Sequence, residues 1–368
     1  MSQNASQIFE PSDSALDRLC QQLADNAGVP QSENQWPTSS LQLCGQSGVF
    51  AWFIDKLYGG QGWNSRQITE GYLALSKACL KTTFIITQRT SATDRIQTSH
   101  NEQLKADLLP DLAAGRTSTT VGISHLTTSR QHTQPAMRAR RVEGGFVVEG
   151  FSPWVTGSPH ADTILMGAVL PDAKQILFIG RRNQIEEQID AQPGFQSAPP
   201  QQLMALTGSQ TGAVHVSDLF VPDSDIVNGP VGNVIKVAAG AMTGGLQTST
   251  LAIGHASAAV QFICNEAEKR ADLQATAAEF SAQLAEARSQ LLARADGQDV
   301  CSQELRKTAN SLVLRATQAA LVAAKGAGYV DGHKVGRWCR EAMFFLVWSC
   351  PQPVSQASLC ELAGVESF

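Results

Sequence analysis

Residues 144–162, GGFVVEGFSPWVTGSPHAD, decide how the rest of the chain is interpreted. The segment 146–148 is apolar and β-branched, and the glycines before it and at Gly150 predict a strand with a turn at each end. Residues 154–156 predict a second short strand. Because side chains two residues apart on a strand point to the same face, Trp154 and Thr156 would offer an aromatic plane and a hydroxyl to one flat ligand. The same pattern is also typical of ordinary core packing.

The composition indicates a globular protein with two or three domains. The chain has 368 residues, of which 43% are hydrophobic and 17% charged. Its net charge of -5 and the lack of a basic run argue against nucleic acid as a partner. No stretch is long and apolar enough to predict a membrane span or a signal peptide, so we expect a cytoplasmic protein. Eight cysteines without paired spacing predict reduced thiols and no zinc or other metal.

The N-terminal part predicts helices. A short helix is expected at Ser14–Ala27, followed by a polar loop that prolines interrupt. Residues 66–89 predict a buried helix with a break near Lys81, and residues 101–114 predict an amphipathic helix that contains Pro110. We therefore predict an N-terminal helical domain over residues 1–117.

The pattern changes to strands after Gly115 and returns to helices near Gly232. Candidate strands lie at 142–149, 154–156, 163–169, 175–179 and 212–216, which predicts an antiparallel barrel or sandwich over residues 118–228. Residues 229–368 predict a four-helix bundle, because apolar residues recur there with gaps of three and four. Small residues dominate these stripes and favour close helix packing and a subunit interface. The expected fold class is α+β.

The run Gly-Gly-Phe-Val-Val-Glu-Gly, the following Trp-Val-Thr-Gly and the pair Ala161-Asp162 resemble the middle β domain of the acyl-CoA dehydrogenase superfamily. The turn Tyr-Gly-Gly-Gln-Gly at 58–62 and the strand end at 218–222 are similar to features of the same family. The resemblance covers residues 40 to 364. It implies the order helices, β domain, helix bundle, a flavin cofactor (FAD, with FMN as the alternative), and a homodimer or homotetramer.

The resemblance also implies cofactor-binding residues. Trp154 would flank the isoalloxazine and Thr156 would bond near its reactive nitrogen. Ser124 falls where the family has a flavin-contacting threonine, but the Glu-Pro that follows in the family is absent here. Arg270 would begin the Arg-Phe-Gly that grips the ADP half, although Phe-Gly is missing. The late Gly-x-Gly-Tyr matches Gly326 and Gly328, where the backbone would approach the dinucleotide of a neighbouring subunit.

The catalytic base of the family is replaced. In the family a glutamate removes an α-proton, and it comes from one of two positions. Those positions are occupied by Gln247 and Gln352. A neutral amide cannot take up the proton, and a positioned base contributes roughly 10²- to 10⁴-fold to rate. Ordinary acyl-CoA α,β-dehydrogenation is therefore not expected.

Three functions remain open. The first is a flavin enzyme that adds oxygen to a small hydrophobic molecule and receives reduced flavin from a reductase. In this case His125, beside Ser124, and His160, which follows Trp154-Val155-Thr156-Gly157, would supply protons or stabilise the peroxide. The second is a divergent dehydrogenase of acyl-CoA-like substrates, linked to an electron-transfer flavoprotein, with Glu341 or Glu361 as base; carboxylates on a C-terminal helix are usually solvent-facing. The third is a non-catalytic binding or assembly protein that keeps the fold.

Overall fold

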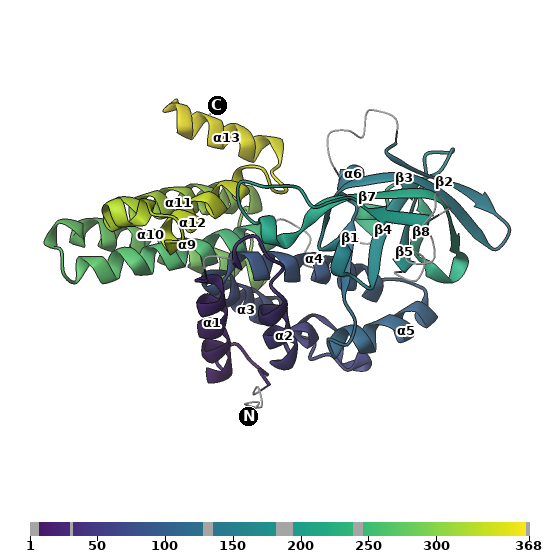
Figure 1. Cartoon of the computed structure of the whole chain (residues 1–368), viewed down its shortest axis with the longest axis horizontal. Coiled ribbons are helices and arrows are strands. Elements are labelled where there is room, and N and C mark those ends of the chain that lie inside the picture. The colour runs from purple at the N-terminus through teal and green to yellow at the C-terminus, as the bar shows by residue number, and fades with distance from the viewer. Residues whose placement is uncertain (1–6, 30–31, 128–134, 182–193, 238–245, 366–368) are drawn as a thin grey trace.

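The computed structural model describes residues 7–29, 32–127, 135–181, 194–237 and 246–365. Helices, strands and helices follow one another along the chain, as expected, and occupy three regions of the molecule (Figure 1). The longer N-terminal helices are α1 (Ser14–Ala27), α2 (Thr38–Gln46), α3 (Ser65–Ala78), α4 (Leu80–Gln97) and α5 (Glu102–Ala113). The C-terminal ones are α9 (Leu246–Ala267), α10 (Gln274–Ala295), α11 (Ser302–Ala324), α12 (Lys334–Ala342) and α13 (Gln352–Ala363).

The strands form one eight-stranded sheet. They are β1 (Thr119–Gly122), β2 (Met137–Val142), β3 (Gly145–Thr156), β4 (Thr163–Val169), β5 (Gln175–Arg181), β6 (Gly194–Ser197), β7 (Thr211–Pro222) and β8 (Ile226–Val231). Their order is β6-β7-β3-β2-β4-β5-β8, with β1 paired to β4. The pairings β1–β4 and β2–β4 are parallel, so the sheet is mixed and the expectation of a wholly antiparallel domain is corrected. The predicted domain boundary at residue 228 falls inside β8.

The α1 helix has the predicted bounds because its leucines recur on one buried stripe, at Leu16, Leu19 and Leu23. The α3–α4 break lies at Cys79, whose backbone is extended (φ -155°, ψ 102°), two residues before the predicted position. Helix α4 is buried almost all round although it is rich in threonine. Its hydroxyls bond back to carbonyls of the preceding turn, as Thr90 Oγ1 does to Ile86 O at 2.9 Å, so their burial is compensated.

The predicted turn at Gly150 is wrong, because β3 runs unbroken through it. Gly150 has φ 125°, and a Cβ there would lie 2.1 Å from the carbonyl oxygen of Ala136. The β3–β7 pairing shifts register beside this residue and again between Ser152 and Val155. A glycine inside a strand commonly marks such a bulge and a close approach of another backbone.

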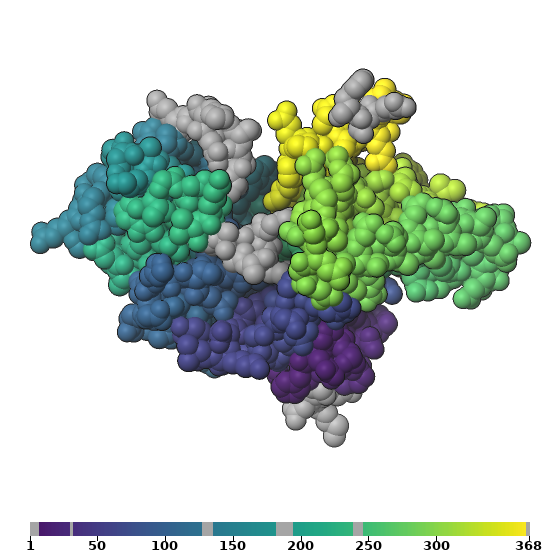
Figure 2. Space-filling model, turned by 180° about the vertical axis from the view of Figure 1, so that it is seen from behind, coloured from purple at the N-terminus to yellow at the C-terminus, as the bar shows by residue number. Residues whose placement is uncertain are grey.

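The two helical regions share one hydrophobic core. Leu19 of α1, Leu75 of α3, Leu251 of α9 and Leu312 of α11 belong to the same buried cluster, whereas the strands pack in two further clusters. Helix α13 lies apart from this core beside α11 (Figure 1). Seen from behind, the surface is notched between the strands and the C-terminal helices, above the N-terminal helices (Figure 2). No helix in the described ranges is long and apolar enough to cross a bilayer.

Candidate functional site

The first candidate site is the end of β3, called here the cofactor wall and defined by Trp154 and Thr156. The indole of Trp154 is 53% exposed, which is unusual for so large an apolar side chain. Thr156 is only 5% exposed. One strand end therefore carries an accessible aromatic plane and a buried hydroxyl, the two groups that the sequence predicted together.

A chain of hydroxyls lies behind the wall. Thr156 Oγ1 is 2.9 Å from Thr211 Oγ1, which is 2.9 Å from Ser209 Oγ. The carbonyl of Thr156 accepts a bond from Thr120 Oγ1 at 2.8 Å. Three hydroxyls carry three protons and the two links use two of them, so one proton remains for another acceptor. The wall can thus donate a hydrogen bond without any charged group.

Ser124 and His125 lie in α6 (Ser124–Thr127), directly after β1 and Ile123. His125 is buried and its Nε2 lies 2.8 Å from the carbonyl oxygen of Gly167. Because a carbonyl only accepts, Nε2 carries the proton and Nδ1 is a bare acceptor, for which the described residues provide no donor. Burial lowers the pKa of His125, so the ring is neutral near pH 7. Nδ1 can therefore accept a proton, while the proton on Nε2 is donated to the carbonyl oxygen of Gly167.

His160 follows the wall in the short turn Ser158–His160. Its Nε2 lies 2.7 Å from Gln210 Oε1, and its ring stacks on Trp36 with centroids 4.3 Å apart. Both contacts hold the ring at the surface beside Thr156. His160 is thus adjacent to the wall in space as well as in sequence.

The residues predicted for the ADP half gather at the end of α11. Arg270 Nη1 donates to Ala323 O at 2.7 Å and Nη2 bonds Asp272 at 3.1 Å, so its guanidinium is engaged by the chain itself. Gly328 is required by packing, since a Cβ there would lie 2.7 Å from Ala324 Cβ. A Cβ at Gly326 would meet nothing within 4 Å. This second group lies on the bundle, separate in the chain from the wall.

The two glutamines occupy different environments. Gln247, near the start of α9, donates from Nε2 to Tyr72 OH at 3.4 Å, and that hydroxyl donates to Thr90 Oγ1 at 2.9 Å. Gln352 begins α13 and is exposed. Gln247 therefore belongs to a buried polar chain between α9, α3 and α4, while Gln352 faces solvent.

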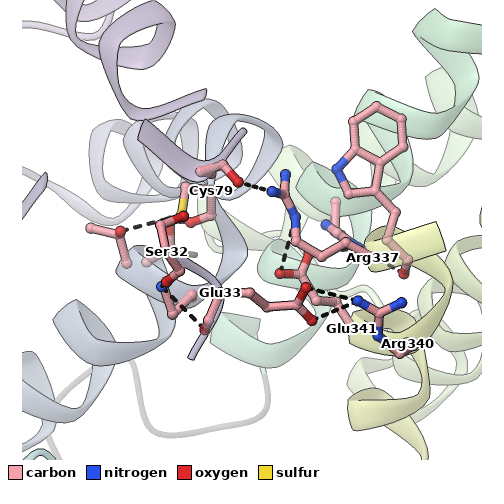
Figure 3. A network of polar contacts seen from close by, with 12 residues as sticks. Ser32, Glu33, Cys79, Arg337, Arg340 and Glu341 are labelled. Carbon is pink, nitrogen blue, oxygen red and sulfur yellow. Dashed lines mark hydrogen bonds and ion pairs between the residues drawn. The ribbon is translucent and has the colours of Figure 1, made fainter. Parts of the chain in front are cut away.

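A third cluster was not anticipated from the sequence. It is the charged junction, defined as Glu33, Lys81, Arg337, Arg340 and Glu341 together with His255. Figure 3 shows Glu33, Arg337, Arg340 and Glu341 converging from the loop after α1 and from α12. Arg340 Nη2 lies 2.7 and 2.8 Å from the two carboxylate oxygens of Glu33.

Glu341 is the innermost carboxylate of this junction. Its oxygens lie 3.6 Å from Arg337 Nε and 3.6 Å from His255 Nε2. Burial raises the pKa of Glu341 to about 7, against the opposing attraction of Arg337, while burial lowers the pKa of His255 to about 4. The expectation that Glu341 faces solvent is wrong, because α12 turns this side toward α9. Glu361 is instead exposed and bonded to Ser311 Oγ at 2.5 Å.

The cavity at the junction is very small. Glu341, Lys81 and Cys79 line about 10 Å³ of space, enough for one water molecule and far too little for a thioester or a flavin ring. Groups of histidine, cysteine and carboxylate that could bind a metal do not occur within the described ranges. The junction is therefore an internal polar contact between regions, and the wall is the accessible site.

Comparisons with known proteins agree with this architecture. Residues 12–116 match the family described as acyl-CoA dehydrogenase, N-terminal domain. Mitochondrial isovaleryl-CoA dehydrogenase of Solanum tuberosum is 24% identical over 86% of this chain and 79% of its own length. Butyryl-CoA dehydrogenase from Megasphaera elsdenii has a TM-score of 0.77 at 18% identity, covering 95% of this chain and 96% of that one.

A neighbour with different chemistry shares the fold. FMN-bound TdsC from Paenibacillus sp. A11-2, a dibenzothiophene monooxygenase, has a TM-score of 0.77 at 16% identity, covering 96% of this chain and 98% of that one. The helix–sheet–helix arrangement is thus the acyl-CoA dehydrogenase fold. Residues 12–116 thus match the N-terminal domain of the acyl-CoA dehydrogenases, and the chain as a whole has the fold of that superfamily.

Proposed function

We propose that the chain is a flavin-dependent oxidoreductase that holds its flavin against the cofactor wall. The observation that carries the proposal is the pairing of an exposed indole with a hydroxyl chain that has one proton to donate. The indole offers a face for a planar ring, and Thr156 offers a donor to an acceptor on its edge. A bound flavin supplies the redox chemistry, and the chain supplies binding and orientation.

FAD is the first candidate and FMN the second. Gly326 leaves open space at the end of α11, so a dinucleotide could come close to the protein backbone there. Arg270 is already bonded to Ala323 and Asp272, so it has less capacity for a pyrophosphate. One neighbour of the fold is described as FMN-bound, which supports testing both cofactors.

We infer that the reaction is not ordinary α,β-dehydrogenation of an acyl-CoA. Gln247 and Gln352 cannot accept an α-proton. Glu341 has a pKa of about 7, as a general base would, but the cavity it lines admits only a water molecule. Oxygen addition to a small hydrophobic substrate, with reduced flavin from a reductase, needs no such base. The neutral His125, with its bare Nδ1, is a candidate proton acceptor on the β1 side of this domain.

The test is the absorption spectrum of the purified protein with and without added FAD or FMN. Bands near about 370 and 450 nm that co-purify or appear on titration would support the proposal. Anaerobic addition of a panel of acyl-CoA thioesters then separates the reactions. Bleaching of the flavin would favour a divergent dehydrogenase, whereas an unchanged spectrum together with oxygen uptake on reduction would favour the monooxygenase class.

A colourless protein that takes up neither flavin would overturn the proposal. It would favour the third possibility, a binding or assembly protein that retains the fold. We further propose a homodimer or homotetramer, because Val322, Tyr329 and Val347 on the C-terminal region are large apolar side chains that are at least three-quarters exposed. Sedimentation of the purified chain tests this.

A further inference from the structure

Loop residues 32–37 contact all three regions of the molecule. The Trp36 ring lies on the β domain, where it stacks on His160 at an interplanar angle of 13°. The carbonyl of Gln35 accepts a bond from Lys81 Nζ of α4 at 3.1 Å. The carboxylate of Glu33 binds Arg340 of α12. This loop, called here the strap, thus has side-chain contacts both to the turn after the wall and to the bundle.

The β-domain end of the strap packs directly against the main chain that follows Thr156. Gly157 has φ 65°, and a Cβ there would lie 2.5 Å from Trp36 Cη2. Its amide donates to Gln210 O at 3.2 Å, and Gln210 precedes Thr211, the hydroxyl partner of Thr156. The ring of Trp36 therefore covers Gly157, whose hydrogen bond to Gln210 links the residue after Thr156 to the residue before Thr211.

The strap is also fixed along its length. Glu33 is held by two charge-assisted bonds to Arg340, and its carbonyl accepts the amide of Gly208 at 3.3 Å. Lys81 Nζ additionally donates to the carbonyl of Ser32. Pro37 restricts the backbone of Trp36 to extended conformations. With the chain anchored on both sides, the indole is held in one place against Gly157.

We propose that Trp36 is a positioning residue of the cofactor wall, acting through Gly157 and His160 on Thr156, and that Glu33 assists it by anchoring the strap to α12. This inference rests on the proposed function. It places a determinant of flavin binding in the N-terminal region, 120 residues before Thr156 in the chain. Trp36 touches the turn and not the hydroxyl itself, so its effect is on the orientation of the wall.

The experiment compares flavin binding by the full chain and by the variants Trp36→Ala, Trp36→Phe and Glu33→Gln, using FAD and FMN as probes. Because W36A loses a stacked aromatic pair, its flavin affinity should be about tenfold weaker than that of the wild type, and its visible flavin band should be shifted or broadened. In W36F the affinity should return to within about twofold of the wild type. E33Q should weaken binding about threefold, since one anchor remains at Lys81.

The matched control is Phe151→Ala. Phe151 stacks on His215 at 5.6 Å, so it is a similar pair on the same strand, away from the wall. F151A should bind flavin as the wild type does. If W36A fails to fold by circular dichroism, His160→Ala breaks the same stack from the exposed side and is measured instead.

The outcomes are distinguishable. A wild type that binds no flavin overturns the proposed function and this inference with it. A wild type that binds flavin, with W36A or H160A binding equally well and with an unchanged band, overturns the inference alone. Equal weakening in F151A and W36A would do the same, because it would indicate general destabilisation of the β domain.

Discussion

The hydroxyls behind the cofactor wall and the side chains of the charged junction both form buried polar clusters. The first cluster is neutral and the second is charged. The wall uses neutral hydroxyls, and the pair Thr156–Thr211 comes from two adjacent strands. The junction uses charged side chains from a loop, α4 and α12, and these surround the neutral His255 of α9. Burying a hydroxyl costs little once it has one partner, whereas a buried charge must be compensated fully. The wall can therefore keep a donor for a ligand, while the junction is committed to holding the protein together.

The largest effect should come from removing a cation of the junction. Arg337→Met leaves Glu341 buried beside His255 without its guanidinium, which should cost about 3 kcal/mol of the free energy of unfolding near pH 8.5. The cost should be smaller near pH 6, because Glu341 is then mostly protonated. Urea denaturation at both pH values measures it.

Arg66→Met is the control for that variant. Arg66 pairs with Asp296 across the same helical regions, but both side chains are more than a third exposed. Its loss should cost less than about 1 kcal/mol at either pH. Equal losses in the two variants would contradict the view that burial makes the junction different.

The next largest effect is a change of the free energy of unfolding with pH. Between about pH 4.5 and 7 the folded chain keeps a proton on Glu341 that the unfolded chain releases, so this group makes stability fall as pH rises through that window. His255 acts oppositely between about pH 4 and 6.5, since only the unfolded chain binds its proton. The two slopes oppose each other in the wild type.

The variant Glu341→Gln removes only the pH dependence of stability that Glu341 causes. Relative to wild type, its stability should rise by about 1.4 kcal/mol per pH unit between about pH 5 and 6.5, and level off above about pH 7. Denaturation midpoints across this range at constant ionic strength test the sign. A flat difference would show that Glu341 ionises normally, and a difference that falls with pH would show that folding lowers its pKa; either result would contradict the prediction.

Substitutions in the cofactor wall should change the free energy of unfolding by the same amount at different pH values. Thr156→Val keeps the shape of the side chain but leaves Thr211 with Ser209 as its remaining hydroxyl partner, at a cost of about 1 kcal/mol that is equal at pH 6 and 8.5. The same variant should lose flavin affinity. Thermal unfolding without flavin, followed by flavin titration, separates the two effects, and a pH-dependent loss would break the contrast between the clusters.

The smallest effect on stability is expected for Trp154→Ala. Because the indole is half exposed, the free energy of unfolding without flavin should change by less than about 0.5 kcal/mol. Flavin binding should nevertheless weaken strongly if the indole lies on the ring. A large loss of stability without any loss of binding would make Trp154 a packing residue.

Local pattern predicted much of the fold. The bounds of α1 and β4 follow from their own residues, since α1 has one buried stripe of leucines and β4 is a short apolar run buried on both faces. The turn expected at Gly150 is not formed, because a glycine is equally compatible with a bulge, and only the approach of Ala136, the residue before β2, decides between them. The parallel β1–β4 pairing depends on chain topology, which no short segment encodes.

The site was predictable to the same limited degree. Trp154 and Thr156 lie two residues apart on one strand, so their proximity could be read directly. The charged junction could not be predicted from the sequence. Glu341 has the pattern of an ordinary helical carboxylate, and only the packing of α12 against α9 shows that it is buried. One signal was available for the strap: Trp36 stands before a proline in an otherwise polar loop, where a tryptophan usually has a partner. Its partner, His160, could not be identified without the fold.

The bond between Glu33 and Arg340 also has a consequence for biosynthesis. The two residues are 307 positions apart. At ribosomal rates the second emerges roughly 15 to 60 seconds after the first. During that interval the leucines of α1 and α3 await α9 and α11, with which they share a core. The nascent N-terminal helices therefore keep these leucines unpaired until α9 and α11 have been synthesised, and the bond between the strap and Arg340 forms late, on the ribosome or after release.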